Sequence, residues 1–535
     1  MVPAVPGSAA RHRPGGRRGL EHLGLRPHAR WVGTPPGFAD HRGAPHLAGG
    51  RASARRAGLG TPVQAGSRDG DRCRGAPGGR HPRRGRGPGC VSGSRATGPA
   101  PADHRPAGSS CGRGRRHRTR SGGCLMPAVW TSLVRPSESP TSRSWATSAS
   151  GTRVRFADGV DALCATSGLW NVPLGYGREE IADAVARALR DASYLTLFRR
   201  GHPLAEEAAQ RLIAYAGGKY QRVIYSTSGS SANDIVLKLV RQFWQLAGAP
   251  QRRIVVGLRG SYHGLTYGSQ ALSGDELGQS VYGVDRRDIR HVPFDDGGVA
   301  LEKLIEREGA RIGALVLEPV LGTGAIAVPP EFLSVVERLR EEHGFLLVAD
   351  EVATGFGRTG MRFASSGWCG SPDALVLSKA LTNGTCAAST VLVGSRIVDA
   401  FTRHDAVFVH GETQAGTPAT CAAILATLDL HESLDVDARF RELTGLLEGT
   451  VSRLLRHDRV TGADGRGAFR AVTIDTDDAG GVGILDVVER IRKQGVIVHP
   501  GPSAVQLIPA AVSTTADLDC IASAIERVLD DLDAR

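Results

Sequence analysis

Residues 345–360 read FLLVADEVATGFGRTG, and this stretch decides the fold. Five apolar residues lead into the adjacent carboxylates Asp350 and Glu351, and a glycine-rich loop follows. A short apolar run that ends in this way is typical of a buried strand in a parallel sheet. Because ligands bind beyond the carboxyl ends of the strands in open α/β sheets, Asp350 is a candidate binding residue.

The same pattern recurs along the chain and predicts the other elements. Five further apolar runs predict strands, at residues 222–226, 253–258, 314–320, 374–378 and 406–410. Apolar residues at helical spacing predict helices between them, at residues 178–190, 231–246 and 331–343. The alternation predicts an α/β fold, with a large doubly wound, mostly parallel sheet domain and a smaller C-terminal α+β domain. We expect residues 126–180 to be an N-terminal segment of the small domain, residues 181–434 the large domain and residues 435–535 the rest of the small domain.

Residues 1–125 differ from the rest in composition. Their 24 arginines against five acidic residues give a net charge of +19, whereas the whole chain is +12, so the remainder is net acidic. The stretch has no Lys, Ile, Asn or Tyr and too little apolar material to fold. An Arg-rich nucleic-acid-binding tail is one interpretation. The joint absence of residues with A/T-rich codons favours a disordered extension or a GC-rich region translated upstream of Met126, so we expect no nucleic-acid partner.

The cysteines and the hydropathy pattern argue against a zinc protein, a disulfide-rich protein and a membrane protein. Nine cysteines are scattered without a CxxC pair, which favours reduced thiols in the cytoplasm over a zinc site or a disulfide framework. We predict no metal. No apolar stretch reaches the length of a membrane span, and the N-terminus has no signal-peptide core.

Two further predicted strands end in polar corners. Residues 225–233 read YSTSGSSAN, where Ser228, Gly229 and Ser230 could cradle a phosphate at a helix N-terminus or simply cap that helix. Tyr262 follows the next strand and could stack on a planar ring or pack as an ordinary loop residue.

A lysine and a carboxylate complete the set of strand-end residues. Residues 373–381 read DALVLSKAL, so Lys379 ends an apolar strand, where it is either a surface lysine or a desolvated amine suited to a Schiff base. Asp350 could hold a cationic ring nitrogen, bind a metal or cap a helix, although the glycine-rich loop after it disfavours the cap.

The order of these motifs resembles the class III aminotransferases of the fold-type I pyridoxal-phosphate (PLP) enzymes. The match runs from about Val154 to Val528 and includes none of residues 1–125. The most specific stretch is residues 350–360 with Lys379 downstream. The other matching stretches are residues 228–233 (SGSSAN), 262–264 (YHG), 318–320 (EPV), 377–381 (LSKAL) and 410–413 (HGET).

The resemblance implies a role for each matching position. Lys379 would be the Schiff-base lysine and would carry the proton between substrate and cofactor carbons, while Asp350 would pair with the pyridine nitrogen. Tyr262 and Val352 would cover the two faces of the ring, and Thr413 would reach the phosphate in a neighbouring subunit, which implies a homodimer with composite sites. The full predicted cofactor-binding set is Ser228, Gly229, Ser230, Tyr262, His263, Glu318, Asp350, Val352, Lys379 and Thr413.

The predicted substrate residues, Trp170 and Gln506, include one departure from the family. Many members that use amino acids carry an Arg where Gln506 stands, and Gln cannot neutralise a carboxylate. We therefore expect a carbonyl substrate without an α-carboxylate. Residues 377–386 and 410–418 also resemble the aminotransferases of daptide pathways, which convert the C-terminal ketone of a decarboxylated peptide into an amine. The alternatives are a small-molecule ω-amine or diamine aminotransferase, another PLP enzyme such as a racemase or decarboxylase, and a nucleic-acid-binding protein with an idle body.

Overall fold

The computed structural model of the protein describes residues 128–477 and 481–534. The extension predicted at residues 1–125 lies outside the described residues. Within them, no helix is both long enough and apolar enough to cross a membrane.

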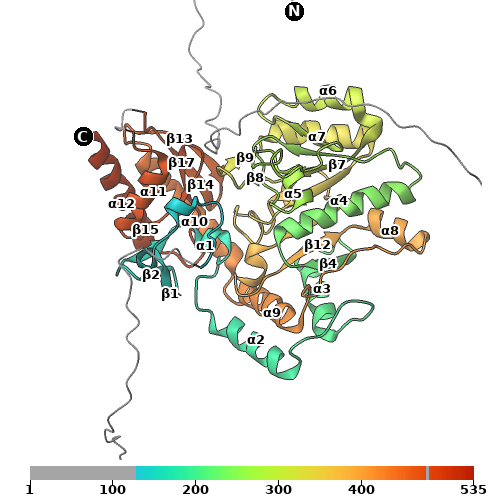
Figure 1. The fold of residues 1–535 in the computed structure, drawn as a ribbon, viewed down its shortest axis with the longest axis horizontal. Coiled ribbons are helices and arrows are strands. Elements are labelled where there is room, and N and C mark those ends of the chain that lie inside the picture. The colour runs from blue at the N-terminus through green and yellow to red at the C-terminus, as the bar shows by residue number, and fades with distance from the viewer. Residues whose placement is uncertain (1–127, 478–480, 535) are drawn as a thin grey trace, which may run out of the picture. The chain divides into compact units, whose positions relative to one another are not determined.

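A seven-stranded sheet forms the centre of the larger group of elements (Figure 1). Its strands are β4 (Arg222–Ser226), β5 (Ile254–Leu258), β6 (Ile289–Val292), β7 (Ile312–Leu317), β10 (Leu346–Asp350), β11 (Ala374–Leu377) and β12 (Ser389–Val393). They lie in the order β4-β12-β11-β10-β7-β5-β6, and β12 runs antiparallel to both of its neighbours. The other four strand pairs of this sheet are parallel, so the prediction of a mostly parallel sheet is confirmed.

Helices cover both faces of this sheet because its strands are apolar on both sides. Leu346 and Val348 of β10 pack in one cluster with α4 and α8, whereas Leu347 and Ala349 face clusters on the opposite side. The opposite face is covered by α6 and α7 at one end and by α3 and α9 at the other. The helices are α2 (Glu179–Asp191), α3 (Pro203–Tyr215), α4 (Gly229–Leu246), α5 (Tyr267–Leu272), α6 (Val299–Glu308), α7 (Pro330–His343), α8 (Ser395–Arg403) and α9 (Pro418–Ser433).

One predicted strand is absent. Residues 406–410 form an extended loop without a strand partner, and Val407 and Val409 are each 74% exposed. Their carbonyl oxygens accept hydrogen bonds from Gln242 and Lys238 of α4. The alternating apolar residues therefore belong to an exposed surface, and the antiparallel place in the sheet is taken by β12, which the sequence did not single out.

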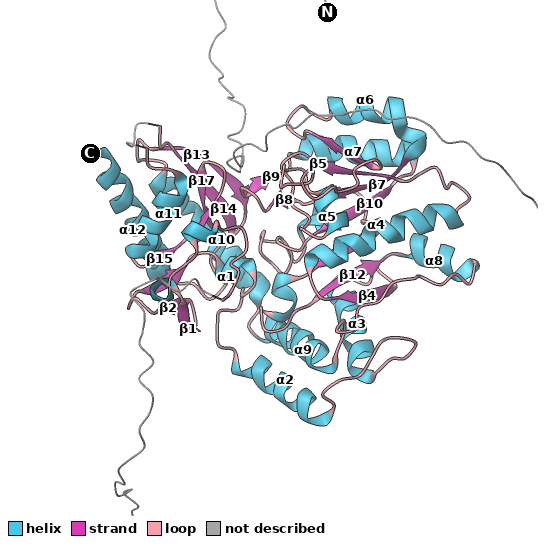
Figure 2. Cartoon of the chain, in the orientation of Figure 1, coloured by secondary structure: helices cyan, strands magenta, loops and turns pink. Residues whose placement is uncertain are grey.

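The remaining strands form three smaller sheets, and Figure 2 shows the two four-stranded ones beside helices at the opposite side of the view. β15 pairs parallel with β3, which joins the N-terminal strands to the C-terminal part of the chain. The boundaries 126–180, 181–434 and 435–535 remain a proposal. The strands are β1 (Ala146–Ser150), β2 (Arg153–Phe156), β3 (Asp161–Cys164), β8 (Val320–Leu321), β9 (Ile326–Ala327), β13 (Val460–Arg466), β14 (Phe469–Ile474), β15 (Val496–Ile497), β16 (His499–Pro500) and β17 (Ala504–Leu507), and the helices are α1 (Ser167–Trp170), α10 (Val436–Leu454), α11 (Ile484–Lys493) and α12 (Thr515–Asp533).

Candidate active site

The carboxyl ends of five sheet strands bring the predicted residues to one edge. Because β4, β5, β7, β10 and β11 run in the same direction, the residues that follow them meet there. In sheet order these residues are Ser228, Lys379, Asp350, Glu318 and Tyr262.

Asp350 is held at the end of β10 by a buried hydrogen-bond network. Its Oδ2 accepts from Asn233 Nδ2 and from His263 Nδ1, both at 2.8 Å, and its Oδ1 accepts from the Val352 N–H at 3.1 Å. Asp350 and His263 are almost fully buried. Since each carboxylate oxygen can accept two hydrogen bonds, Oδ1 retains capacity for one more donor, such as a cationic ring nitrogen.

Two neighbouring groups have shifted pKa values. Burial opposes the charged form of His263, yet the hydrogen bond and charge of Asp350, together with the charge of Glu318, raise the pKa of His263 above its usual value. Burial raises the pKa of Glu318 to about 7, although His263 opposes this shift. Glu318 Oε2 accepts from the Tyr262 N–H at 2.8 Å, and its Oε1 accepts from the Gly322 N–H at 2.9 Å. Glu318 thus fixes the loop that carries Tyr262.

Lys379 follows β11 in a strained conformation. Its φ is +43°, a region that non-glycine residues adopt rarely and mostly at functional sites. Burial lowers the pKa of the Lys379 ammonium, although the charges of Asp350 and Glu318 oppose this effect. Desolvation therefore favours a neutral, nucleophilic amine at this position.

The corner after β4 offers free donors for an anion. Ser228 caps α4 by accepting from the Ser231 N–H at 3.2 Å, and among the described residues no acceptor is bonded to the N–H of Gly229 or Ser230. A Cβ on Gly229 would lie 3.2 Å from the Val352 side chain, so only glycine fits without displacement. The helix N-terminus and these two N–H groups suit a phosphate.

Of the residues predicted to contact the cofactor ring or its phosphate, Tyr262 and Val352 lie beside this corner, whereas Thr413 does not. Tyr262 lies beside this corner because the Leu265 N–H, two residues past His263, donates to Ser230 Oγ at 3.2 Å. Val352 is partly buried against Gly229. Thr413 is exposed and is not brought into the cluster; its carbonyl oxygen accepts from the Tyr194 hydroxyl at 3.0 Å.

The indole ring of Trp170 lies next to the Lys379 side chain. The Lys379 Nζ lies 4.6 Å from the centroid of the indole ring, and the Trp170 Nε1–H has no hydrogen-bond partner among the described residues. All four residues of α1 have positive φ, so α1 is a left-handed turn. Ser167 holds this turn by donating to the Ile508 carbonyl at 2.6 Å, and Asn171 Nδ2 donates to the carbonyls of Gly168 and Leu169.

Gln506 is fully buried on β17, close to Trp170. Its Nε2 donates to the carbonyl oxygens of Gly322 and Thr323, each at 3.2 Å, and its Oε1 has no hydrogen-bond partner in the part of the chain that the structure describes. A Cβ on Gly322 would lie 3.2 Å from the Trp170 ring and 3.3 Å from Glu318 Oε1. Gln506, Glu318 and Trp170 therefore meet around Gly322.

The nearby cation Arg358 is engaged through only one of its amino groups, because its buried Nη2 has no hydrogen-bond partner among the described residues. This buried guanidinium donates from Nη1 to the Pro509 carbonyl at 2.8 Å and to Ser167 Oγ at 3.2 Å. Burial lowers the pKa of Arg358 to about 9. Arg358 thus holds the left-handed turn in place.

Sequence reasoning missed two residues of this region. Asn233 was part of a matching motif, and its position one turn into α4 places its amide against Asp350. His499 on β16 lies edge-on to Trp170, with ring centroids 5.8 Å apart. A histidine opposite Gln506 in the strand register was the available signal, but the register is visible only in the fold.

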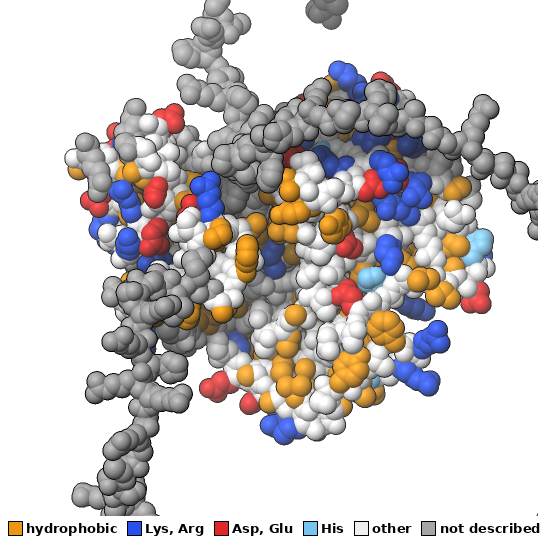
Figure 3. Space-filling model, viewed as in Figure 1, with side chains coloured by type: hydrophobic (Ala, Val, Ile, Leu, Met, Phe, Trp, Pro, Cys, Tyr) orange, Lys and Arg blue, Asp and Glu red, His pale blue; other side chains and the backbone are white. Residues whose placement is uncertain are grey.

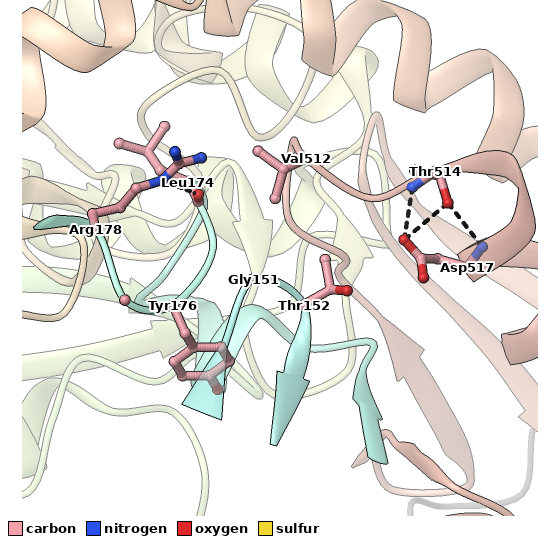
Figure 4. Close-up of a pocket in the computed structure, with 9 residues that line it drawn as sticks. Gly151, Thr152, Leu174, Tyr176, Arg178, Val512, Thr514 and Asp517 are labelled. Carbon is pink, nitrogen blue, oxygen red and sulfur yellow. Dashed lines mark hydrogen bonds between the residues drawn. The ribbon is translucent and has the colours of Figure 1, made fainter. Parts of the chain in front are cut away.

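A metal centre and a surface pocket are two other kinds of site to consider in the described chain. No group of three His, Cys, Asp or Glu residues within it could hold a metal ion. A separate surface pocket lies between the N-terminal strands and the start of α12, where Thr514 and Asp517 cap the helix reciprocally (Figure 4). None of the predicted site residues lines that pocket.

Comparison with known proteins identifies the family. The class III aminotransferase family model matches residues 135–529. The chain is 30% identical over 391 residues to the omega-amino acid–pyruvate aminotransferase of Pseudomonas putida, which covers 68% of this chain and 87% of that protein. It is 29% identical over 411 residues to the putrescine–pyruvate aminotransferase of Pseudomonas aeruginosa, which covers 72% of this chain and 90% of that protein.

Solved structures give the same result. The PLP-bound amine transaminase of an uncultivated Pseudomonas species superposes with a TM-score of 0.69 at 27% identity, covering 77% of this chain and 99% of that one. A transaminase solved with L-alanine also gives a TM-score of 0.69 at 27% identity, covering 73% and 99%. The chain therefore belongs to the class III aminotransferases and is a PLP-dependent transaminase of fold type I.

Proposed function

We propose that this transaminase transfers an amino group to a carbonyl compound that has no carboxylate beside the reacting carbon. The observation that carries the proposal is Gln506. Its amide N–H groups are spent on backbone carbonyls, and only the acceptor Oε1 is free of a partner among the described residues. A carboxylate near it would be desolvated without a cation, which costs several kcal/mol.

The strand-end residues are proposed to act together on the cofactor and the substrate. PLP supplies a carbonyl that condenses with amines and a ring that withdraws electrons. The free N–H groups of Gly229 and Ser230, beside Ser228, would hold its phosphate, and Asp350 would hold its ring nitrogen, with His263 and Asn233 fixing the carboxylate.

The remaining roles concern the ring faces and the proton. Tyr262 and Val352 would cover the two faces, and Glu318 would keep Tyr262 in place through its backbone N–H. The Lys379 amine would remove the proton from the substrate carbon and return it to the cofactor carbon. Trp170 would confine the substrate on the side opposite the sheet.

We also propose a homodimer in which Thr413 serves the neighbouring subunit's cofactor. A Cβ on Gly411 would lie 2.7 Å from the Phe198 ring, so the loops at residues 194–198 and 407–413 lie side by side. Exposed apolar side chains gather on these loops and nearby, and Figure 3 shows hydrophobic groups on the face that carries α2, α3 and α8. Such a patch is typical of a protein interface. The exposed side chains include Tyr194, Leu195, Phe198, Tyr267, Val407 and Val409.

Two substrate classes fit this proposal. The relatives named for omega-amino acids and putrescine favour a small-molecule ω-amine or diamine. The peptide ketone of daptide-type pathways is the narrower candidate, supported by the motifs at residues 377–386 and 410–418. The five cysteines of the described residues are all unpaired, in keeping with a proposed cytoplasmic location.

A single half-reaction tests the proposal. The enzyme is loaded with the aminated cofactor, and single-turnover rates are compared for a 2-oxo acid and its methyl ketone counterpart at pH 8. We expect the ketone to react faster. If the oxo acid reacts much faster, an unrecognised cation binds carboxylates and the argument from Gln506 is wrong. A synthetic peptide ending in a methyl ketone, compared with the same ketone lacking the peptide, separates the two substrate classes.

A further inference from the structure

His499 stands at the reaction site although no motif pointed to it. Its imidazole lies edge-on to Trp170, and the Lys379 Nζ lies 4.6 Å from the centroid of the same indole. The charge of Lys379 also contributes to the lowered pKa of His499, after burial. The imidazole and the Lys379 amine therefore share one neighbour, the indole ring of Trp170.

The ring nitrogens of His499 are not committed to the fold. Among the described residues neither nitrogen makes a hydrogen bond, and the ring is partly exposed. Its partner in the strand register, Gln506, spends its amide donors on Gly322 and Thr323 instead. His499 thus offers the substrate one donor and one acceptor when neutral, or two donors when charged.

The charges around His499 leave Lys379 as the dominant influence. Burial first, and then the charge of Lys379, lower the pKa of His499, so the ring is largely neutral at pH 7. β17 contributes the uncharged Gln506, and α1 contributes Trp170. The helix packed against β16 is α11, whose charged residues are Asp486, Glu489, Arg490, Arg492 and Lys493. Arg492 pairs with Glu489 and Asp158, Lys493 lies 4.0 Å from Glu489, and Asp486 caps the helix.

We propose that the protonation state of His499 selects the class of substrate: the neutral ring accommodates uncharged ketones and amines, and the imidazolium binds the carboxylate of an acid substrate. The proposal rests on the proposed function, because it supplies the carboxylate recognition that Gln506 cannot. A transaminase must often admit an acid in one half-reaction and a different carbonyl compound in the other. A side chain beside the indole that can gain or lose its charge suits both substrates. A permanently charged side chain would be left buried and unpaired whenever an uncharged substrate is bound.

The test uses the holoenzyme converted to its aminated form and measures a ratio. Single-turnover rate constants are compared for a 2-oxo acid and the matched methyl ketone between pH 5 and pH 8, so that effects on the cofactor and Lys379 cancel. We expect the acid-to-ketone ratio to fall about tenfold for each pH unit above the pKa of His499. In His499→Gln the ratio should be low and independent of pH, and in His499→Arg it should be high and independent of pH.

A second readout keeps the test independent of turnover. Propionate is titrated into the holoenzyme while the visible absorbance of the cofactor is followed, and its affinity should fall with rising pH in the wild type but not in His499→Gln. His291→Gln is the matched control. That ring is also half-buried with a lowered pKa, but its Nε2 bonds to the Leu272 carbonyl at 2.8 Å, so we expect the wild-type pH profile.

The possible outcomes separate the two proposals. A pH-independent ratio in the wild type, or a pH dependence that survives in His499→Gln, overturns the role of His499. If the ketone is preferred throughout with a flat ratio, the proposed function stands without it. If the acid is preferred at every pH but the ratio still falls with pH only when His499 is present, the proposed function fails and the role of His499 stands.

Discussion

Replacing Glu318 with Gln should change how the stability of the cofactor-free protein depends on pH. Burial raises the pKa of Glu318 to about 7 from an ordinary value of 4.5. Between these two values the folded protein holds a proton that the unfolded chain has lost. Stability must therefore fall as the pH rises through this window, and the loss is complete above pH 7.

The size of the effect follows from the same pKa values. The difference between 4.5 and about 7 corresponds to about 3 kcal/mol of unfolding free energy. In Glu318→Gln this contribution is absent at every pH. The amide also faces the Tyr262 and Gly322 N–H groups with only one acceptor, which adds a pH-independent loss of about 1–3 kcal/mol. The raised pKa of His263 also lowers stability at high pH, and because the charge of Glu318 contributes to that shift, the difference between the two proteins reports Glu318 together with its effect on His263.

Urea unfolding followed by circular dichroism measures this difference at pH 4.5, 5.5, 6.5 and 7.5, at one protein concentration. The wild type should lose about 3 kcal/mol more than Glu318→Gln across the series. Glu306→Gln, on the exposed side of α6, is the control and should follow the wild type. Parallel curves for wild type and Glu318→Gln would refute the reasoning, because Glu318 would then titrate alike in the folded and unfolded chains.

Three further predictions concern the cofactor. Lys379→Ala should retain the fold by circular dichroism but lose turnover, and borohydride reduction of the wild type followed by peptide mapping should find the pyridoxyl group on Lys379 and on no other lysine. Asp350→Asn should still bind PLP but lose about 2 kcal/mol of transition-state stabilisation, roughly 30-fold in kcat, and an unchanged rate would remove Asp350 from the mechanism. Thr413→Ala should weaken PLP binding about tenfold or more in an absorbance titration. Mixed dimers of Lys379→Ala and Thr413→Ala subunits should regain up to half of the wild-type activity, since one site is then intact; no recovery would show that Thr413 acts within its own subunit.

Local sequence pattern predicted five of the seven strands of the large sheet and the edge that carries the candidate site, but not β6 or β12. Each apolar run from 222–226 to 374–378 forms a strand, because an apolar segment of that length between polar corners is stable only when buried on both faces. The run at 406–410 has the same composition but lies exposed on a loop. Composition cannot distinguish a segment that is buried in a core from one that is buried against another subunit. In the proposed dimer, the apolar residues of 406–410 would be covered by the neighbouring subunit.

The turn α1 and the positions of Asn233 and His499 could not be predicted from the sequence, because they depend on tertiary contacts. The left-handed turn of α1 is strained at its three non-glycine residues. It persists because Ser167 and Arg358 bind it to distant groups, while Asn171 bonds to carbonyls within it. The role of Asn233 depends on the approach of α4 to Asp350, and that of His499 on the register of β16 against β17. Each depends on contacts between residues far apart in the chain, which no local pattern encodes.

The charges at the site bear on substrate choice more directly than its shape does. Gln506 was predicted only as a missing cation, but its free Oε1 makes it an acceptor that repels a carboxylate. Arg358 is the cation that could have replaced it, yet its Nη1 is bonded to Pro509 and Ser167, and drawing it away would release the turn that carries Trp170. Its Nη2 has no hydrogen-bond partner among the described residues but is buried, so a carboxylate that bound Arg358 would have to displace the residues that cover it. A titratable group beside Trp170 whose ring nitrogens make no hydrogen bond among the described residues avoids that cost, and His499 is such a group.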